Sequence, residues 1–274
     1  MGSIEWVEQP TKTKLRARIP KNRMVMSYRS NLSVSLRDLN ERELFCDTSL
    51  ILVTLADLFM KKLVDGILEF RKNLRPTYRK LFSELALGQS PYALFIGCSD
   101  SRVAVNVFAS TDPGDLFVSR NVGNLVPAYQ EDESPNLGNA VAATMEFALH
   151  NLKVADIIIC GHSECGAMHA LIEGREKIKT PNLSAWLSHG ESGLVKLGSF
   201  NSKLSKQNEL SQINVLEQIE HLKTYPIVRE RIKTGTLKIH GWWFDLKTAD
   251  VYALNAKLNR FELFNEELVN RSYS

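Results

Sequence analysis

Apolar and polar residues follow a regular order only from about residue 58 onwards. Apolar residues recur at helical spacing over 63–70, and a second helical segment covers 78–87. Residues 88–91 contain glycine and proline, which interrupt a helix, and the apolar run 92–97 has the length of a short buried strand. The ordered part of the chain is therefore predicted to begin with two helices followed by a strand.

Strands and helices alternate through the rest of the chain. Further strands are predicted at 115–119, 154–160, 236–244 and 250–254, and helices at 137–152, at 209–225 and in a shorter segment after Pro226. The run 154–160 is almost continuously apolar, as expected for a parallel strand covered on both faces. The last two strands alternate well enough to form an antiparallel pair. Strands separated by helices predict an α/β fold with a mainly parallel central sheet flanked by helices.

Composition and charge limit the classes of partner. The 274 residues are 44% apolar and 24% charged, as in an ordinary globular protein, and the net charge is only +3. Residues 11–37 contain eight Lys or Arg and no acidic residue. This basic segment lacks the interleaved aromatic residues of a nucleic-acid-binding patch, so we expect no nucleic-acid partner.

The boundaries of the predicted domains follow from the same pattern. We interpret 1–57 as a basic N-terminal extension that is mobile or loosely packed, 58–265 as one α/β domain, and 266–274 as a C-terminal tail. Two alternatives stay open for the extension: an Arg- and Ser-rich start with few acids is typical of an organelle transit segment, and translation from Met60 would omit it.

Apolar stretches and cysteines indicate the compartment. The longest apolar stretch, 49–60, contains Asp57 and is well short of the roughly 20 residues that span a bilayer. We therefore expect no membrane span, and we see no signal peptide. Four cysteines, Cys46, Cys98, Cys160 and Cys165, are too few for a disulfide framework. A reducing compartment, the cytoplasm, is predicted, with organelle import left open.

Two segments carry residues with metal-binding chemistry. Cys98-Ser-Asp-Ser-Arg102 follows the strand that ends at Gly97, and His162-Ser-Glu-Cys165 follows the strand that ends at Cys160. In open parallel sheets, ligands bind beyond the carboxyl ends of the strands. If these two strands are neighbours, Cys98, His162 and Cys165 converge on one site.

Two thiolates and one imidazole indicate Zn²⁺ rather than Mg²⁺ or Ca²⁺, which prefer oxygen ligands. Three protein ligands leave the fourth tetrahedral position open for water, and an open position is typical of catalytic zinc. Cys160 as a fourth ligand would instead make the zinc structural. A buried, inert thiol is the commoner role for a cysteine at the end of an apolar strand.

Asp100 and Arg102 lie two residues apart beside the first predicted ligand. One interpretation is a local ion pair that stiffens the loop. The other is catalytic: two thiolates cancel the charge of Zn²⁺, so the site gains from a carboxylate that orients the bound water, while Arg102 keeps Asp100 ionised. We favour the catalytic role.

At these residues the chain resembles the β-carbonic anhydrases, above all the bacterial, cyanobacterial and plant-like members. Five segments over about 58–262 carry the resemblance: Cys98-Ser-Asp-Ser-Arg-Val103, Pro113-Gly-Asp-Leu-Phe-Val-Ser-Arg-Asn-Val-Gly-Asn124, Glu146 in Met-Glu-Phe, Cys160-Gly-His-Ser-Glu-Cys-Gly-Ala167, and His240-Gly-Trp-Trp-Phe-Asp245. The joint presence of Cys-x-Asp-x-Arg and His-x-x-Cys is highly specific, whereas either alone is weak.

The resemblance implies a four-stranded parallel core with an antiparallel edge strand, and a homodimer or homotetramer. It implies zinc on Cys98, His162 and Cys165, with Asp100 and Arg102 controlling the fourth position. The implied activity is reversible hydration of carbon dioxide to bicarbonate and a proton. In some members the counterpart of Asp100 itself binds zinc at low pH, and the sequence leaves the resting state open.

Two other functions on the same scaffold stay open. A hydrolase of carbon disulfide or carbonyl sulfide would use the same zinc chemistry behind a different access channel. A catalytically silent, zinc-stabilised assembly protein would need no acidic residue beside the fourth coordination position of the zinc. The presence of both Asp100 and Arg102 favours an enzyme.

Overall fold

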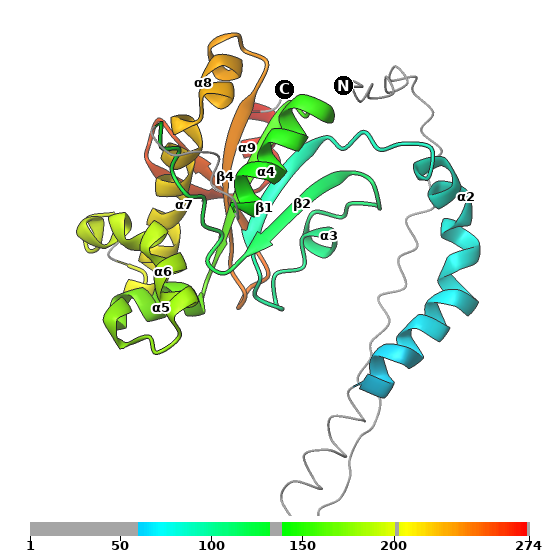
Figure 1. Ribbon diagram of the computed structural model, residues 1–274, viewed down its shortest axis with the longest axis horizontal. Coiled ribbons are helices and arrows are strands. Elements are labelled where there is room, and N and C mark those ends of the chain that lie inside the picture. The colour runs from blue at the N-terminus through cyan, green and yellow to red at the C-terminus, as the bar shows by residue number, and fades with distance from the viewer. Residues whose placement is uncertain (1–59, 132–138, 201–202, 273–274) are drawn as a thin grey trace, which may run out of the picture. The chain divides into compact units, whose positions relative to one another are not determined.

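The computed structural model describes residues 60–131, 139–200 and 203–272 (Figure 1). The chain divides into two compact units, 1–88 and 89–274. The predicted extension 1–57 and Cys46 lie outside the described residues, so the domain boundary at residue 57 stays a prediction. Within the described residues, no helix combines the length and the apolar character needed to cross a membrane.

The described part of the first unit is helical, as predicted. A helix over 60–69 continues through η1 (Phe70–Leu74) into α2 (Arg75–Leu85). Pro76 lies inside this continuous helix, directly after η1, and it has no N–H to donate to the preceding turn. None of residues 60–87 is buried, and Leu63 and Ile67 are 64% and 65% exposed. The apolar stripe of this segment therefore finds no core among the described residues of its own unit.

The second unit is built on a six-stranded sheet in the order β2-β1-β3-β4-β5-β6. Its strands are β1 (Ala93–Cys98), β2 (Leu116–Asn121), β3 (Asp156–His162), β4 (Lys238–Phe244), β5 (Val251–Asn255) and β6 (Arg260–Leu263). The strands β2, β1, β3 and β4 are parallel, and β5 and β6 add antiparallel pairs. The mainly parallel sheet is confirmed, and so is the antiparallel pairing of the strands predicted at 236–244 and 250–254.

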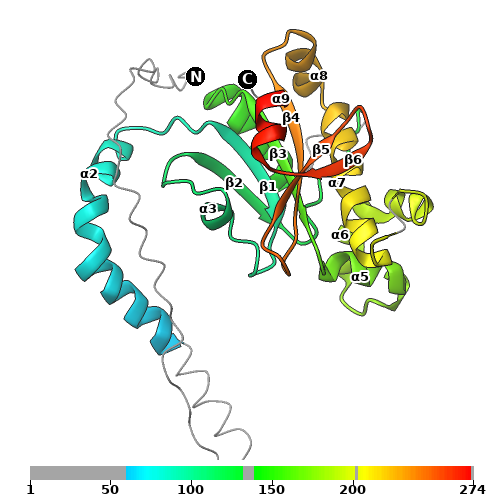
Figure 2. The ribbon, with the colours of Figure 1, turned by 180° about the vertical axis from the view of Figure 1, so that it is seen from behind.

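The helices of the second unit lie on both faces of the sheet (Figures 1 and 2). They are α3 (Val105–Phe108), α4 (Ala140–Glu146), η2 (Phe147–Asn151), α5 (Gly166–Glu173), η3 (Arg175–Lys177), α6 (Pro181–Leu187), η4 (Ser188–Lys196), α7 (Lys206–Thr224), α8 (Pro226–Lys233) and α9 (Glu266–Ser272). The predicted helices at 137–152 and 209–225 correspond to α4 with η2 and to α7.

Strand alternation divides the core between the two faces. Leu94 and Ile96 of β1 join the cluster formed with α4, α7 and α8, whereas Ala93 and Phe95 join the cluster on the other face, which includes Val105 of α3. All six residues of β1 are buried. Full burial on both faces explains why the central strands are continuous apolar runs in the sequence.

The structure adds two features to the predicted C-terminal region. One antiparallel edge strand was expected, but β6 adds a second, which is only four residues long and too short to give a periodic signal. The segment 266–274 was interpreted as a tail, but Glu266–Ser272 is helix α9, and its Leu268 is buried. An isolated buried leucine among polar residues gives little helical pattern.

Helix α7 approaches β3 closely at Gly161. A Cβ atom on Gly161 would lie 2.8 Å from Cγ2 of Val215 and 3.1 Å from the main-chain oxygen of Ser211. These distances leave no room for a methyl group, so the helix and the strand are in contact because this position is glycine.

We predict that Gly161→Ala lowers the free energy of unfolding by about 1–3 kcal/mol, because the added methyl group pushes α7 away from β3. Urea unfolding followed by circular dichroism measures the change. Gly66→Ala is the matched control, since a Cβ there has nothing within 4 Å, and helix propensity favours alanine by up to about 1 kcal/mol. An alanine at position 161 that unfolds like the wild type would contradict the close approach.

Candidate metal centre

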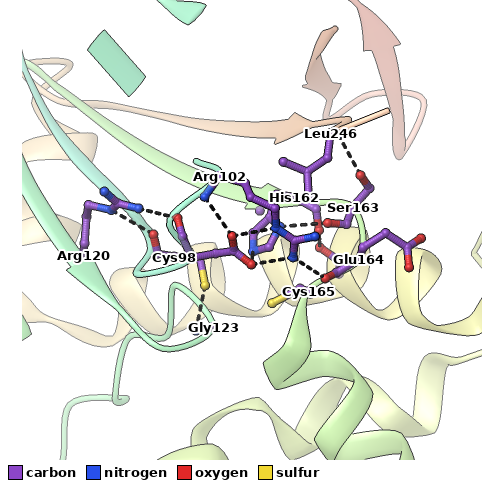
Figure 3. A network of polar contacts seen from close by, with 12 residues as sticks. Cys98, Arg102, Arg120, Gly123, His162, Ser163, Glu164, Cys165 and Leu246 are labelled. Atoms are coloured by element: carbon purple, nitrogen blue, oxygen red, sulfur yellow. Dashed lines mark hydrogen bonds and ion pairs between the residues drawn. The ribbon is translucent and has the colours of Figure 1, made fainter. Parts of the chain in front are cut away.

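The two predicted segments meet at the carboxyl ends of two neighbouring parallel strands. Strands β1 and β3 are parallel neighbours, with Gly97 paired to Cys160, so the residues after them leave the sheet side by side. The donor atoms of Cys98, His162 and Cys165 all lie within 4.8 Å of one another. Figure 3 shows these three side chains pointing toward one another. Their exposed fractions are 5%, 0% and 1%, so the cluster is buried.

The imidazole of His162 has one nitrogen free for a ligand. Its Nδ1 lies 2.8 Å from the carbonyl oxygen of Ser163, which can only accept, so Nδ1 carries the proton. Its Nε2 is buried and has no hydrogen-bond partner among the described residues. A buried acceptor without a partner costs about 1–3 kcal/mol. A metal ion at Nε2 would remove this penalty, and the fixed tautomer suits metal binding.

The two thiols differ in their acidity. The contact with Cys165 lowers the pKa of Cys98 to about 4, and the N–H of Gly123 donates to Cys98 Sγ at 3.4 Å. The pKa of Cys165 is raised, first by its hydrogen bond to Cys98 and then by burial. Without a metal, the pair therefore shares one proton. A dication that binds here displaces that proton and is held by two thiolates.

Cys160 does not belong to this cluster. Its thiol faces the main-chain oxygen of Gly161 at 3.4 Å, and burial raises its pKa. It packs with apolar residues of the sheet, including Phe95 and Ile158. Among the described residues, the group of possible metal donors contains Cys98, His162 and Cys165 but not Cys160. The geometry therefore favours a site with three protein ligands over one with four.

Asp100 and Arg102 form a two-pronged ion pair beside the cluster. Arg102 donates from Nε to Oδ1 at 2.9 Å and from Nη2 to Oδ2 at 2.7 Å. The main-chain N–H of Arg102 also donates to Oδ1. These hydrogen bonds hold the pKa of Asp100 well below its usual range. Oδ2 of Asp100 lies 3.9 Å from Nε2 of His162, so the ionised carboxylate borders the position where a metal would bind.

Arg120 on β2 supports the first loop, a role that the sequence analysis did not assign. Its Nε donates to the carbonyl oxygen of Cys98 at 2.9 Å, and its Nη2 donates to that of Asp100 at 2.6 Å (Figure 3). The parallel register places it directly beside Gly97. Arg120 directly follows the strand predicted at 115–119, but the groups that it contacts are known only from the pairing of β1 with β2.

Helix α7 supports the second loop with polar side chains. Gln207 donates to the carbonyl oxygen of Cys165 at 3.0 Å, and Ser211 donates to that of His162 at 2.7 Å. Asn208 accepts from the N–H of Glu164, a residue with a positive φ of 55°. Arg102 joins the two loops by donating to the carbonyl oxygen of Glu164 at 3.1 Å. These hydrogen bonds hold the main chain of the loop from His162 to Cys165.

The donor set fits a zinc ion. Two sulfurs and one imidazole nitrogen are ligands that Zn²⁺ prefers, and the partnerless Nε2 of His162 is oriented into the cluster. The main-chain hydrogen bonds around Cys98, His162 and Cys165 fix the donors before any metal binds. A site whose ligands are already held in place binds a metal more tightly, because metal binding costs little further conformational entropy.

Comparison with known proteins agrees with this geometry. The family of carbonic anhydrases matches residues 93–251. The chain is 38% identical over 204 residues to a carbonic anhydrase of Pseudomonas aeruginosa, covering 74% of this chain and 90% of that one. It is 38% identical over 201 residues to a carbonic anhydrase of Synechococcus elongatus, covering 72% of each chain.

Solved structures give the same result. The β-carbonic anhydrase CcaA matches with a TM-score of 0.69 at 36% identity, covering 76% of this chain and 93% of that one. A tetrameric β-carbonic anhydrase from Sordaria macrospora matches with a TM-score of 0.58 at 28% identity, covering 74% and 98%. An α/β fold with a buried Cys-His-Cys cluster defines the class, and the chain belongs to the β-carbonic anhydrase family. It is therefore an enzyme of the lyase class.

We predict that Cys98→Ser abolishes zinc retention, because a serine hydroxyl is a far weaker ligand than a thiolate. Zinc per chain, measured by plasma mass spectrometry after gel filtration, should fall from about one to near zero. Cys160→Ala is the matched control, since it removes a buried thiol outside the cluster, and its zinc content should be unchanged. Loss of zinc from Cys160→Ala would show that Cys160 is a ligand.

Proposed function

We propose that this chain catalyses the zinc-dependent, reversible hydration of carbon dioxide to bicarbonate and a proton. Cys98, His162 and Cys165 would hold the zinc ion. The observation that carries the proposal is a buried cluster of these three donors with the carboxylate of Asp100 at its border. Hydration of carbon dioxide is the activity of the family, and the donors required for it are present in this chain.

A zinc ion on these donors would supply Lewis acidity, the chemistry by which zinc lowers the pKa of a water molecule. Asp100 would orient this water. As an ionised carboxylate it can only accept hydrogen bonds, so it directs the proton of the water toward itself and the lone pair toward the substrate. Arg102 and Glu164 keep the carboxylate in place through the contacts described above.

The charge of Asp100 does not vary near neutral pH. Its pKa is depressed, so the contribution of the Asp100–Arg102 pair to stability is fully present above the ordinary carboxyl pKa of about 3.9. That contribution is lost only as the pH falls toward the lower pKa of the folded state. Any change of activity between neutral and alkaline pH therefore comes from the metal centre or from other groups.

The two alternative functions have no specific support. Nothing in the described residues distinguishes a channel for carbon disulfide or carbonyl sulfide from one for carbon dioxide. A silent assembly protein would have no need of the two-pronged Asp100–Arg102 pair, whose carboxylate faces the cluster. Carbon dioxide hydration uses every part of this site and is the activity of the matched family.

We predict that Asp100→Asn retains zinc but lowers kcat for carbon dioxide hydration by about 10–100-fold, because an amide also presents donors to the water. Stopped-flow hydration assays from neutral to moderately alkaline pH measure the loss. Asp156→Asn is the matched control: Asp156 lies at the opposite end of β3, paired with His240. Full activity of Asp100→Asn at unchanged zinc content would remove Asp100 from the mechanism.

We further propose that the chain assembles as a homodimer or homotetramer. The helix over 60–69 displays an apolar stripe that no described residue of its own unit buries, and this stripe includes Leu63, Ile67 and Leu68. Exposed apolar stripes of this kind are typical of interfaces. A related β-carbonic anhydrase from Sordaria macrospora is tetrameric. A second copy of this chain is therefore the proposed partner.

The oligomer should depend on this stripe. We predict that Ile67→Asp shifts the chain toward monomers, because a carboxylate would have to be buried in an apolar contact. Sedimentation velocity measures the shift. Lys62→Gln, which by helical spacing lies on the opposite side of the same helix, lowers the net charge by the same one unit and should leave the oligomer intact. An Ile67→Asp variant with wild-type mass in solution would contradict the proposed interface.

We propose the cytoplasm, a reducing compartment, as the location of this chain. Cys98, Cys160 and Cys165 are all free thiols in the described residues. Two of them are proposed zinc ligands, which require thiolates and would be lost to oxidation.

A further inference from the structure

One main-chain N–H donates directly to a proposed ligand sulfur. The N–H of Gly123 lies 3.4 Å from Cys98 Sγ, within the usual range for a hydrogen bond to sulfur. A thiolate that accepts such a bond holds part of its charge in that bond. It then donates less charge to a metal, in the same way that hydrogen bonds to sulfur tune iron–sulfur centres.

Trp186 contacts the other end of the same peptide group. Its indole Nε1 donates to the carbonyl oxygen of Val122 at 2.8 Å. The carbonyl of Val122 and the N–H of Gly123 belong to one rigid, planar peptide unit. Holding the carbonyl therefore fixes the direction of the N–H, and a hydrogen bond to the carbonyl also makes the N–H a stronger donor. Trp186, Val122, Gly123 and Cys98 form one chain of hydrogen bonds that ends at sulfur.

The next peptide group is fixed by helix α7. Asn214, which is buried, donates from Nδ2 to the carbonyl oxygen of Gly123 at 3.0 Å, and it accepts from Gln218. Gly123 has a positive φ of 83°, and a Cβ there would lie 3.0 Å from that of Ala167. With both flanking carbonyls held, the direction of the Gly123 N–H is set by the hydrogen bonds that Trp186 and Asn214 donate.

We propose that Trp186 is a positioning residue of the metal centre, which acts through the Val122–Gly123 peptide to moderate the charge that Cys98 Sγ donates to the metal. This inference rests on the proposed function, because it requires a metal held by Cys98. Trp186 belongs to α6, is partly exposed, and packs edge-on against His189 with ring centroids 5.5 Å apart. It has no polar contact with Cys98, His162 or Cys165, so its effect passes through the peptide.

A weaker N–H bond to sulfur has a defined consequence. Cys98 would donate more charge, the metal would attract electrons less strongly, and the activation of water would suffer. Binding of carbon dioxide would be unaffected, since the indole acts on the sulfur and not on the substrate. We therefore expect kcat to fall and KM to stay unchanged.

The test compares Trp186→Phe with the wild type as full-length chains, each loaded with zinc or with Co²⁺. Phenylalanine keeps the ring and removes the indole N–H. In the cobalt form, the sulfur-to-metal charge-transfer band should move to lower energy, because the electrons of Cys98 are held less tightly. In the zinc form, kcat for hydration should fall about tenfold at unchanged KM and zinc content, the low end for residues that support a ligand.

Trp242→Phe is the matched control, because it removes an indole N–H that is buried without a hydrogen-bond partner in the described residues. It should change neither the band nor kcat. If Trp186→Phe does not fold, Asn214→Ser tests the direction of the same Gly123 N–H through the next peptide group, with the same shift expected. A wild-type cobalt band and wild-type kcat in the folded variant overturn the role of Trp186.

The same measurements separate this inference from the function on which it rests. A wild-type chain that binds no metal, or that binds metal and does not hydrate carbon dioxide, overturns the proposed function and the role of Trp186 with it. If the wild-type chain binds metal and hydrates carbon dioxide, and the Trp186→Phe variant has the same cobalt band and the same kcat, only the role of Trp186 is overturned.

Discussion

The structure of the site depends on the parallel pairing of β1 with β3. This pairing, in which Gly97 lies opposite Cys160, makes two segments more than sixty residues apart in the chain leave the sheet at the same edge. One segment contributes Cys98 with the Asp100–Arg102 pair, and the other contributes His162 and Cys165. The strands themselves are buried and apolar on both faces, so their register is set by core packing. The donors meet because the hydrophobic core positions the strands that precede them.

Helix α7 supports the loops around the metal donors in addition to packing on the sheet, and its apolar stripe does not predict this second role. It packs on the sheet through Val215, Ile219 and Leu222, yet it also buries Ser211, Asn214 and Gln218. Buried polar groups need partners, and here the partners are main-chain groups of the loops around the cluster. The helix thus supplies core packing and loop support together. Close contact at Gly161 is what lets its short polar side chains reach these loops.

The two units of the chain show opposite relations between sequence and burial. In 89–274 the apolar residues lie in closed clusters on both sides of the sheet. In the described residues of 1–88, an equally regular apolar stripe stays exposed. A stripe that repeats at helical spacing predicts only that some apolar surface will cover it. That surface can belong to another copy of the chain, which is why a helix pattern alone does not predict a domain boundary.

Local pattern and chemistry were enough to predict β1 to β5, the long helices and the three donors, because periodic burial and soft ligands are properties of short segments. The loop-supporting roles of Arg120, Trp186 and Asn214 could not be predicted in this way. Each role depends on a hydrogen bond from a side chain to a main-chain carbonyl distant in sequence. Every residue has a main-chain carbonyl, so the residue types do not show which one will accept the bond. The sequence by itself determined which atoms can bind a metal. Only the tertiary structure decided how those atoms are held, because hydrogen bonds to main-chain groups depend on where the strands and α7 bring each loop.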